Sequence, residues 1–234
     1  PSHSKGFKHN IMKSVLHLSH TDINYDGRIL KEMTALKRLG IDVKGIGVNM
    51  NEGVENSDFN KEIEIKSINL KSRSLTFLPK VILHFLSVIE ITIKMLVHAV
   101  KSKPDVIHCH DTLVLPLGVL AKYLTKSRLI YDAHELESDR NGLSKILGKL
   151  TLFVEKRLWR FIDSLIVVSP SIEKWYNDKV GEKSTTVILN SPPLDDSMRL
   201  EENNYLREHF SIPENNKIFI YVGILGSGRG IEQI

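Results

Sequence analysis

The sequence predicts an α/β fold in which a parallel β-sheet is covered by helices on both of its faces. Short apolar, β-branched runs alternate with helical patterns through most of the 234 residues, as in strand–helix–strand units. The run SLIVVS, from Ser164 to Ser169, is apolar almost throughout, which is typical of a strand buried on both faces. A helix start follows this run immediately, so the strand passes straight into a helix.

Each expected element corresponds to one such run or pattern. The expected strands are residues 14–20, 41–48, 62–68, 105–110, 128–134, 164–169 and 185–190. The expected helices are residues 28–39, 76–101, 113–125, 142–160 and 170–179. Gly40 follows the first helix, where a left-handed backbone is needed. Ser169 and Pro170 supply the N-cap and the first residue of the last helix.

The helix expected over residues 76–101 contains the longest apolar stretch, from Val81 to Val100. Its polar members recur every three or four positions, as on the wet face of an amphipathic helix: Lys80, His84, Ser87, Glu90, Lys94, His98 and Lys101. A membrane-spanning helix needs about 20 mostly apolar residues without such charges. We therefore interpret the segment as a core helix.

The composition, 41% hydrophobic and 26% charged, is that of an ordinary soluble globular protein. The formal net charge of +4 suits phosphate-bearing ligands or an anionic membrane surface. Lys/Arg blocks interleaved with aromatic residues do not occur in the sequence, so we expect no nucleic-acid partner. A single cysteine, Cys109, and an N-terminal stretch without a signal-peptide pattern favour a cytoplasmic location.

The alternation of strands and helices stops at NSPPLDD, residues 190–196, where consecutive prolines indicate an extended connection. We assign residues 1–192 to an N-terminal domain, 193–216 to a linker with a short helix, and 217–234 to the incomplete start of a second domain. This last segment runs from an apolar strand into glycines that let backbone N–H groups approach a phosphate. The alternative is that its strand completes the first sheet.

Polar side chains collect where the predicted strands end. Ligands of open parallel sheets bind at the carboxyl ends of the strands, where the connecting loops diverge. We therefore expect a cleft lined by Asn24, His110, Asp111, Asp132, Glu135, Ser169 and Asn190.

The stretch HCHD allows two interpretations. His108 and His110 alternate along a strand, so they point to one face of the sheet and Cys109 points to the other. Together with three neighbours they can form a binuclear, hydrolase-like metal site: Asp111, Asp132 and His134. Alternatively, His108 is a hydrogen-bonded residue at the strand end and His110 is part of the cleft wall.

His134 ends a central strand on a loop before a helix. There it can donate a hydrogen bond to a ligand hydroxyl or phosphate oxygen, or transfer a proton. Asp132 points the same way along the strand and can orient the imidazole. The alternative is that His134 only caps the loop, satisfied by Asp132 or Glu135.

Gly27 and Arg28 lie at the start of the first helix. A flexible glycine at a helix N-terminus lets a ligand phosphate approach, and Arg28 can pair with an anion. The alternative is that Asp26 caps the helix and Arg28 is solvated.

Residues 70–80 mix basic and apolar side chains, which would suit docking on an anionic bilayer surface. The basic residues are Lys71, Arg73 and Lys80, and the apolar ones include Leu75, Phe77 and Leu78. A polar loop that leads into a core helix explains the same residues equally well.

Six stretches in order resemble glycosyltransferase family 4, the nucleotide-sugar enzymes of the GT-B fold. They are INYDGRILKEMTALKRLGIDV, KPDVIHCHDTLVLPLGVLAKYL, RLIYDAHELESD, LWRFIDSLIVVSPSIEKWY, TTVILNSPP and IFIYVGILGSGRGIEQI. The resemblance spans the chain from about residue 11 onward. It implies two Rossmann-like domains that face each other across a cleft, with the acceptor mostly on the N-terminal domain and the donor mostly on the C-terminal one.

The resemblance also implies roles for particular residues. His134 matches the family's strand-end histidine near the transferred sugar, which makes it the candidate catalytic residue. Gly27 and Arg28 match the first loop, and Gly228, Arg229 and Gly230 match the donor-phosphate loop of the second domain. Many members have a second glycine in the first loop, and a basic residue where this chain has Ile224. The missing glycine weakens the expected backbone approach to the donor phosphate. Ile224 leaves Arg229 as one cation where two are usual, or the phosphate is compensated by residues outside this sequence.

The implied reaction is retaining transfer of a sugar from a nucleoside-diphosphate sugar to a hydroxyl of a glycan or lipid-linked acceptor. The resemblance implies that the enzyme uses no metal and no cofactor beyond the donor. It also implies a role in bacterial surface polysaccharide synthesis. Any membrane contact would be with the inner face of the plasma membrane. The family's two glutamates of the second domain fall beyond Ile234, so the 234 residues alone are expected to be inactive.

Two other classes of function stay open at this stage. One is a metal-dependent hydrolase built on His108, His110, Asp111, Asp132 and His134, which stoichiometric metal would favour. The other is a non-catalytic Rossmann-like binding domain. A nicotinamide-dependent enzyme is disfavoured, because the first strand runs into HTDINYDG and not into a G-x-G-x-x-G turn.

Overall fold

The computed structural model describes residues 13–49, 63–75, 77–140, 143–191 and 204–222. The chain divides into two compact units, Pro1–Asn190 and Ser191–Ile234. The first unit contains the sheet and the candidate site. In the second, the described residues contain a short helix, α6 (Tyr205–Phe210). Arg207 of this helix donates hydrogen bonds from its guanidinium to the carbonyls of Pro213 and Asn216, which follow the helix.

The first unit is built on a seven-stranded sheet in the order β3-β2-β1-β4-β5-β6-β7, and every neighbouring pair is parallel. The strands are β1 (Ser14–Ser19), β2 (Asp42–Val48), β3 (Glu64–Ile68), β4 (Val106–His110), β5 (Arg128–Ala133), β6 (Ser164–Val167) and β7 (Thr185–Val187). Each lies within a run expected to be a strand. The α/β fold with a parallel sheet is therefore confirmed.

In the described residues, five helices connect these strands: α1 (Gly27–Arg38), α2 (Lys80–Ser102), α3 (Leu115–Thr125), α4 (Lys145–Leu158) and α5 (Pro170–Lys179). Short 3-10 turns accompany them: η1 (Ile23–Tyr25), η3 (Lys71–Ser74), η4 (Glu137–Asp139) and η5 (Trp159–Phe161). Asp26 caps α1 by accepting from the Arg28 and Ile29 amides, and Ser169 caps α5. Gly40 is left-handed at φ 78°, as expected after α1.

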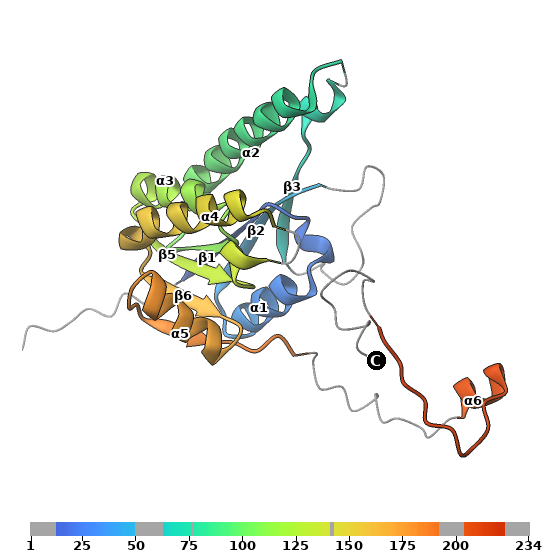
Figure 1. Ribbon diagram of the computed structural model, residues 1–234. Coiled ribbons are helices and arrows are strands. Elements are labelled where there is room, and N and C mark those ends of the chain that lie inside the picture. The colour runs from blue at the N-terminus through green and yellow to red at the C-terminus, as the bar shows by residue number, and fades with distance from the viewer. Residues whose placement is uncertain (1–12, 50–62, 76, 141–142, 192–203, 223–234) are drawn as a thin grey trace, which may run out of the picture. The chain divides into compact units, whose positions relative to one another are not determined.

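Helices cover both faces of the sheet, with α3 and α4 on one side and α1 on the other (Figure 1). The larger hydrophobic core includes Met95 of α2, Ala121 of α3 and Tyr176 of α5. The smaller one places Ile29 and Met33 of α1 with Val43 of β2. Burial of apolar surface on both sides is the main force that holds such a layered fold together.

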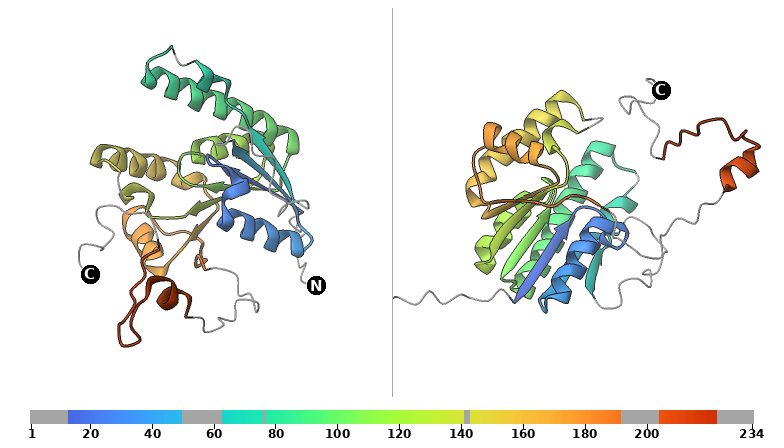
Figure 2. Two further views of the ribbon diagram at one scale, coloured as in Figure 1. Left: turned by 90° about the vertical axis from the view of Figure 1, so that its right-hand side faces the viewer. Right: turned by 90° about the horizontal axis from the view of Figure 1, so that it is seen from below.

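The position of α2 differs from the sequence-based expectation of a core helix. Only Met95 and Ala99 are buried along this helix, and 6% of its most apolar stretch is covered. Its N-terminal end extends beyond the sheet (Figures 1 and 2). The core-helix interpretation is therefore wrong for this end of α2, because a periodic polar stripe shows that a helix is amphipathic but not what covers its apolar side.

The apolar segment that begins at Lys217 was expected to start with a strand. Its described part, residues 217–222, has no strand pairing, and the seven-stranded sheet does not include it. The segment belongs to the second unit, so the alternative that it completes the first sheet stays a prediction. A strand exists only with a hydrogen-bonded partner, which an apolar sequence cannot supply by itself.

The strand order reverses direction between β1 and β4. From β1 the chain moves outward through β2 and β3, and from β4 it moves the other way through β5 to β7. Loops that leave β1 and β4 at their carboxyl ends therefore diverge and leave a crevice, the place where ligands bind in open α/β sheets. The polar groups predicted at these strand ends lie at this point.

Candidate functional site

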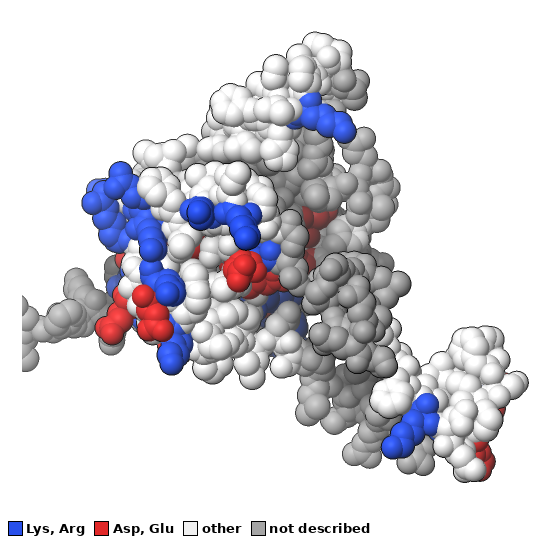
Figure 3. Space-filling view, in the orientation of Figure 1, with Lys and Arg blue, Asp and Glu red and all other residues white. Residues whose placement is uncertain are grey.

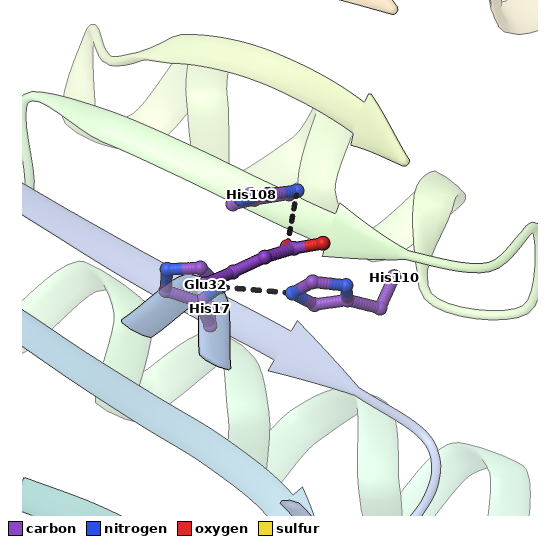
Figure 4. Close-up of side chains that lie close together, drawn as sticks. All are labelled: His17, Glu32, His108 and His110. Atoms are coloured by element: carbon purple, nitrogen blue, oxygen red, sulfur yellow. Dashed lines mark hydrogen bonds and ion pairs between the residues drawn. The ribbon is translucent and has the colours of Figure 1, made fainter. Parts of the chain in front are cut away.

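A cluster of histidines lies across the strands on both sides of this crevice. His17 comes from β1, and His108 and His110 come from β4. The register places His17 opposite His108, and His110 opposite Asp132 of β5. Figure 4 shows the three histidines gathered on one face with Glu32 of α1 pointing toward them. Cys109 points to the other face and contacts α3, as the alternation predicted.

The histidine rings form a hydrogen-bonded chain that leads outward. His17 Nδ1 lies 2.8 Å from His110 Nε2, and His110 Nδ1 lies 2.9 Å from His134 Nε2. His17 and His110 are completely buried, whereas 17% of the His134 side chain is exposed. His134 is therefore the member of this chain that reaches the surface, and His110 lies beneath it.

Asp132 is the centre of the cluster. Its side chain is fully buried, and Oδ1 accepts a 2.7 Å hydrogen bond from Arg28 Nη2. Its other oxygen, Oδ2, lies near three imidazole nitrogens, at 3.2 Å from His134 Nε2, 3.4 Å from His110 Nδ1 and 3.5 Å from His108 Nε2. Burial disfavours the carboxylate, but the hydrogen bonds from the histidines outweigh it and hold the pKa of Asp132 below its usual range.

His134 is the imidazole that this environment protonates most readily. Burial lowers its pKa, but the hydrogen bond and negative charge of Asp132, with a smaller contribution from Asp111, raise it above the ordinary value of 6.5. On the two inner rings the effect of burial prevails, so their pKa values fall below the ordinary value. Burial lowers the pKa of His17 well below the usual value, and with the nearby His108 it lowers that of His110 to about 3. The environment thus favours the protonated form at His134 and disfavours it at His17 and His110.

Glu32 is part of the cluster but was not among the predicted site residues. Arg28 Nε lies 3.2 Å from Glu32 Oε1, four residues along α1, and His108 Nε2 lies 3.8 Å from Oε2. Burial and the charge of Asp132 raise the pKa of Glu32 to about 7. The i,i+4 spacing of Arg28 and Glu32 was visible in the sequence, but such pairs are usually solvated.

Asp111 and His20 lie beside His134. His20 Nδ1 is 3.1 Å from Asp111 Oδ2, and Asp111 Oδ1 is 3.8 Å from His134 Nδ1. Asp111 has a left-handed backbone with φ 74°, an uncommon conformation for a residue other than glycine. Burial opposes ionisation of Asp111, but His20 and His134 lower its pKa. The Asp111 carboxyl group thus stands between the rings of His20 and His134 at this edge.

The first loop forms one wall of an open pocket of about 520 Å³, lined by Thr21, Asp22, Tyr25, Asp26, Gly27, Arg28 and Asn190. Gly27 has open space around it, since an added Cβ would meet no atom within 4 Å. Arg28 is 9% exposed and bound to two carboxylates, so its guanidinium is not solvated. The proposed phosphate contact of Gly27 and Arg28 stays a prediction.

The other predicted site residues make contacts outside the histidine cluster. Asn24 donates hydrogen bonds to Asp22 and Ser67, and Glu135 is exposed beside Arg140. Ser169 is the N-cap of α5, and Asn190 accepts a hydrogen bond from Lys31 Nζ at 3.4 Å. Gly228, Arg229 and Gly230, as well as Ile224, lie outside the described residues.

Two groups of side chains in the described residues have the donor atoms to hold a metal ion. One contains His17, Glu32, His108 and His110, and the other contains His110, Asp132 and His134, with the donor atoms of each group within 4.8 Å of one another. Asp111 is in neither group. Asp111 lies next to the second group, with Oδ2 3.1 Å from His20 Nδ1 and Oδ1 3.8 Å from His134 Nδ1, and the binuclear site stays a prediction.

A family model described as a glycosyl transferase 4-like domain matches residues 28–191 of this chain. The chain belongs to the glycosyl transferase 4-like family. The match covers α1 from Arg28 onward, the histidines of β4, and Asp132 and His134. The resemblance to glycosyltransferase family 4 is thus confirmed. No curated protein sequence matches the chain.

Solved glycosyltransferase structures share the fold at low identity. A sucrose-phosphate synthase from Thermosynechococcus elongatus is 18% identical, with a TM-score of 0.59 over 86% of this chain and 53% of that one. HepE from Anabaena, solved in complex with UDP and glucose, is 17% identical, with a TM-score of 0.55 over 86% of this chain and 50% of that one. A shorter synthase chain gives a TM-score of 0.54 at 18% identity, over 76% of this chain and 90% of its own.

These similarities show the fold: the described sheet is a Rossmann-like half of a GT-B glycosyltransferase. The chain spans about half the length of the longer structures that it matches, 53% of the synthase and 50% of HepE.

Proposed function

We propose that this glycosyl transferase 4-like chain forms the acceptor side of a retaining glycosyltransferase. The proposed enzyme moves a sugar from a nucleoside-diphosphate sugar to a hydroxyl of a glycan or lipid-linked acceptor, in bacterial surface polysaccharide synthesis. One observation carries the proposal: a partly exposed His134, made readily protonated by the buried Asp132, stands at the end of β5 beside the point where the strand order reverses.

His134 is the residue that we assign to the reaction centre. Its Nε2 faces Asp132 and His110, and its Nδ1, at 3.8 Å from Asp111, is beyond hydrogen-bond distance of that carboxylate. An imidazolium at this position donates a hydrogen bond to a sugar hydroxyl or phosphate oxygen. A positive charge there also stabilises negative charge as it develops on the departing diphosphate.

The buried members of the cluster act through His134. Arg28 holds Asp132, and Asp132 holds the His134 ring and favours its protonated form. In the reaction the acceptor oxygen replaces the diphosphate on the anomeric carbon, on the same face of the sugar, and the hydroxyl proton is released. Most donor contacts are assigned to residues that correspond to the other half of the solved relatives. The part of the donor site proposed for this chain consists of Gly27 and Arg28 in the first loop, with Gly228, Arg229 and Gly230.

Calorimetric titration of UDP-, GDP- and ADP-sugars tests the proposal. The longest natural form of the protein is compared with the 234-residue chain and with a His134→Ala variant. We expect the natural form to bind one class of nucleotide sugar and the variant to bind it more weakly. His98→Ala removes a histidine of α2 and is the matched control. Failure of the longest natural form to bind any nucleotide sugar would overturn the proposal.

A further inference from the structure

The N-terminal half of α2 presents an apolar stripe to solvent. Val81 is 81% exposed and Phe85 65%, and the stripe continues through Val88, Ile89 and Ile93. These positions recur at intervals of three or four, so they lie on one side of the helix. Figure 3 shows this protruding end as a largely uncharged surface. Side chains of this size are normally buried, and here the described residues of the first unit leave them exposed.

The length and composition of α2, Lys80–Ser102, would allow it to cross a membrane, but its packing excludes that for the folded chain. Met95 and Ala99 are fully buried in the larger core, and Lys94 Nζ binds the carbonyl of Asn69. The part before Lys94 is about 21 Å long at 1.5 Å per residue, shorter than the hydrocarbon core of about 30 Å. This half of α2 can enter a bilayer surface but cannot span it.

The preceding turn is fastened to α2 as one unit. Glu90 accepts hydrogen bonds from the amides of Lys71 and Ser72, and the Ser72 hydroxyl bonds to Ser87. These bonds and Lys94 outweigh the effect of desolvation and lower the pKa of Glu90 to about 2. The turn therefore has a defined position next to the apolar stripe.

The charges beside the stripe are positive up to Ile89, and Glu90, which follows, is paired with Lys94. Residues 69–89 contain three basic residues, Lys71, Arg73 and Lys80, and no aspartate or glutamate. Lys71 and Lys80 are exposed, as is Phe77 at 80%. Apolar side chains bordered by cations match a bilayer that has anionic headgroups above its hydrocarbon.

A groove continues from the stripe toward the candidate site. It has a volume of about 610 Å³, and its lining is mostly apolar: His20, Leu70, Lys80, Leu83, His84, Ser87, Val88, Ile91, Thr92, Leu113, Val114 and Leu117. His20 at one end is the residue that pairs with Asp111. The surface of α2 and the edge that bears His134 are thus joined by one apolar path.

We propose that the N-terminal half of α2 docks on an anionic phospholipid bilayer, with Val81, Phe85 and Val88 among the headgroups and upper acyl chains. The contact predicted for residues 70–80 extends along α2 to Ile93. Docking would place the site within reach of a membrane-bound acceptor through the groove. That consequence rests on the proposed function, but the docking itself does not.

Flotation of the full chain with vesicles tests the docking without any sugar donor. One set of vesicles is phosphatidylcholine, and the other contains about one third phosphatidylglycerol. We expect binding to the anionic vesicles that salt weakens. A Val81→Ser/Phe85→Ser variant should bind about tenfold more weakly or worse, because it loses two inserted apolar side chains.

Matched controls lie on or directly after α1, which covers the other face of the sheet. Leu39, directly after α1, is 76% exposed, so Leu39→Ser removes a similarly exposed apolar side chain. Lys37→Glu is the control for Lys80→Glu, which removes a cation beside the stripe and should also weaken binding to the anionic vesicles. We expect both controls to bind like the wild type. Absence of vesicle binding, or equal loss in the α1 and α2 variants, would overturn the proposal. Light scattering without lipid tests whether a second copy of the chain covers this face instead. If the protein forms a dimer that the α2 variant abolishes, and does not bind vesicles, the docking proposal is refuted.

Discussion

Replacement of Glu32 by glutamine changes the pH dependence of stability. Glu32 packs between Arg28 and His108, and its side chain is 13% exposed. Burial, with the neighbouring charge of Asp132, raises the pKa of Glu32 from 4.5 to about 7. Since a raised carboxyl pKa means that the folded state favours the neutral form, stability is lost as pH rises from the unfolded value toward the folded one. Glutamine resembles the neutral form and does not ionise.

The size of the effect follows from the pH range between the ordinary pKa of a glutamate, 4.5, and the pKa of Glu32 in the folded chain, about 7. Above pH 5 the unfolded chain releases the Glu32 proton, whereas the folded chain keeps it until about pH 7. Each pH unit in between lowers the free energy of unfolding by about 1.4 kcal/mol, which gives about 3 kcal/mol over two units. We expect Glu32→Gln to gain this amount relative to the wild type between pH 5 and pH 8.

Urea unfolding of both proteins across this pH range measures the difference. Other groups that titrate in the same window, such as Glu137, are present in both proteins and cancel. Glu182→Gln, at an exposed position, controls for the loss of one carboxylate from the surface. If the stability curves of the wild type and Glu32→Gln run parallel from pH 5 to pH 8, Glu32 does not lie in the environment described and the reasoning is refuted.

Two further predictions concern the coupling of His134 and the packing of α3. Asp132→Asn should lower the pKa of His134, because burial alone opposes the charged ring once the carboxylate is gone; NMR titration of the imidazole measures this, and an unchanged pKa would show that Asp132 does not act on the ring. Gly118→Ala should destabilise the protein by about 1–3 kcal/mol, because its Cβ would lie 2.1 Å from Cys109 Sγ. The same change in a Cys109→Ala background should cost less, and an equal cost in denaturant unfolding would contradict the contact.

Much of the site was predictable because it depends on local alternation. His108 and His110 share a face because they stand two apart on β4, and Asp132 on β5 and His134 directly after it repeat the spacing. The burial of these groups was less predictable. His110 was interpreted as part of the cleft wall, yet it is completely buried under His134. Alternation gives the direction of a side chain but not its depth.

The sequence by itself determined the expected elements, the faces of their side chains and several helix ends, including Asp26, Gly40 and Ser169. These features follow from the preferences of a few adjacent residues, so they are readable from a short stretch. Only the tertiary structure decided that Glu32 meets His108, that Arg28 binds a carboxylate 104 positions away, and that the apolar side of α2 stays uncovered. The physical reason is that such contacts depend on strand order and on which surfaces a fold has available to cover a helix, and neither is encoded in local periodicity.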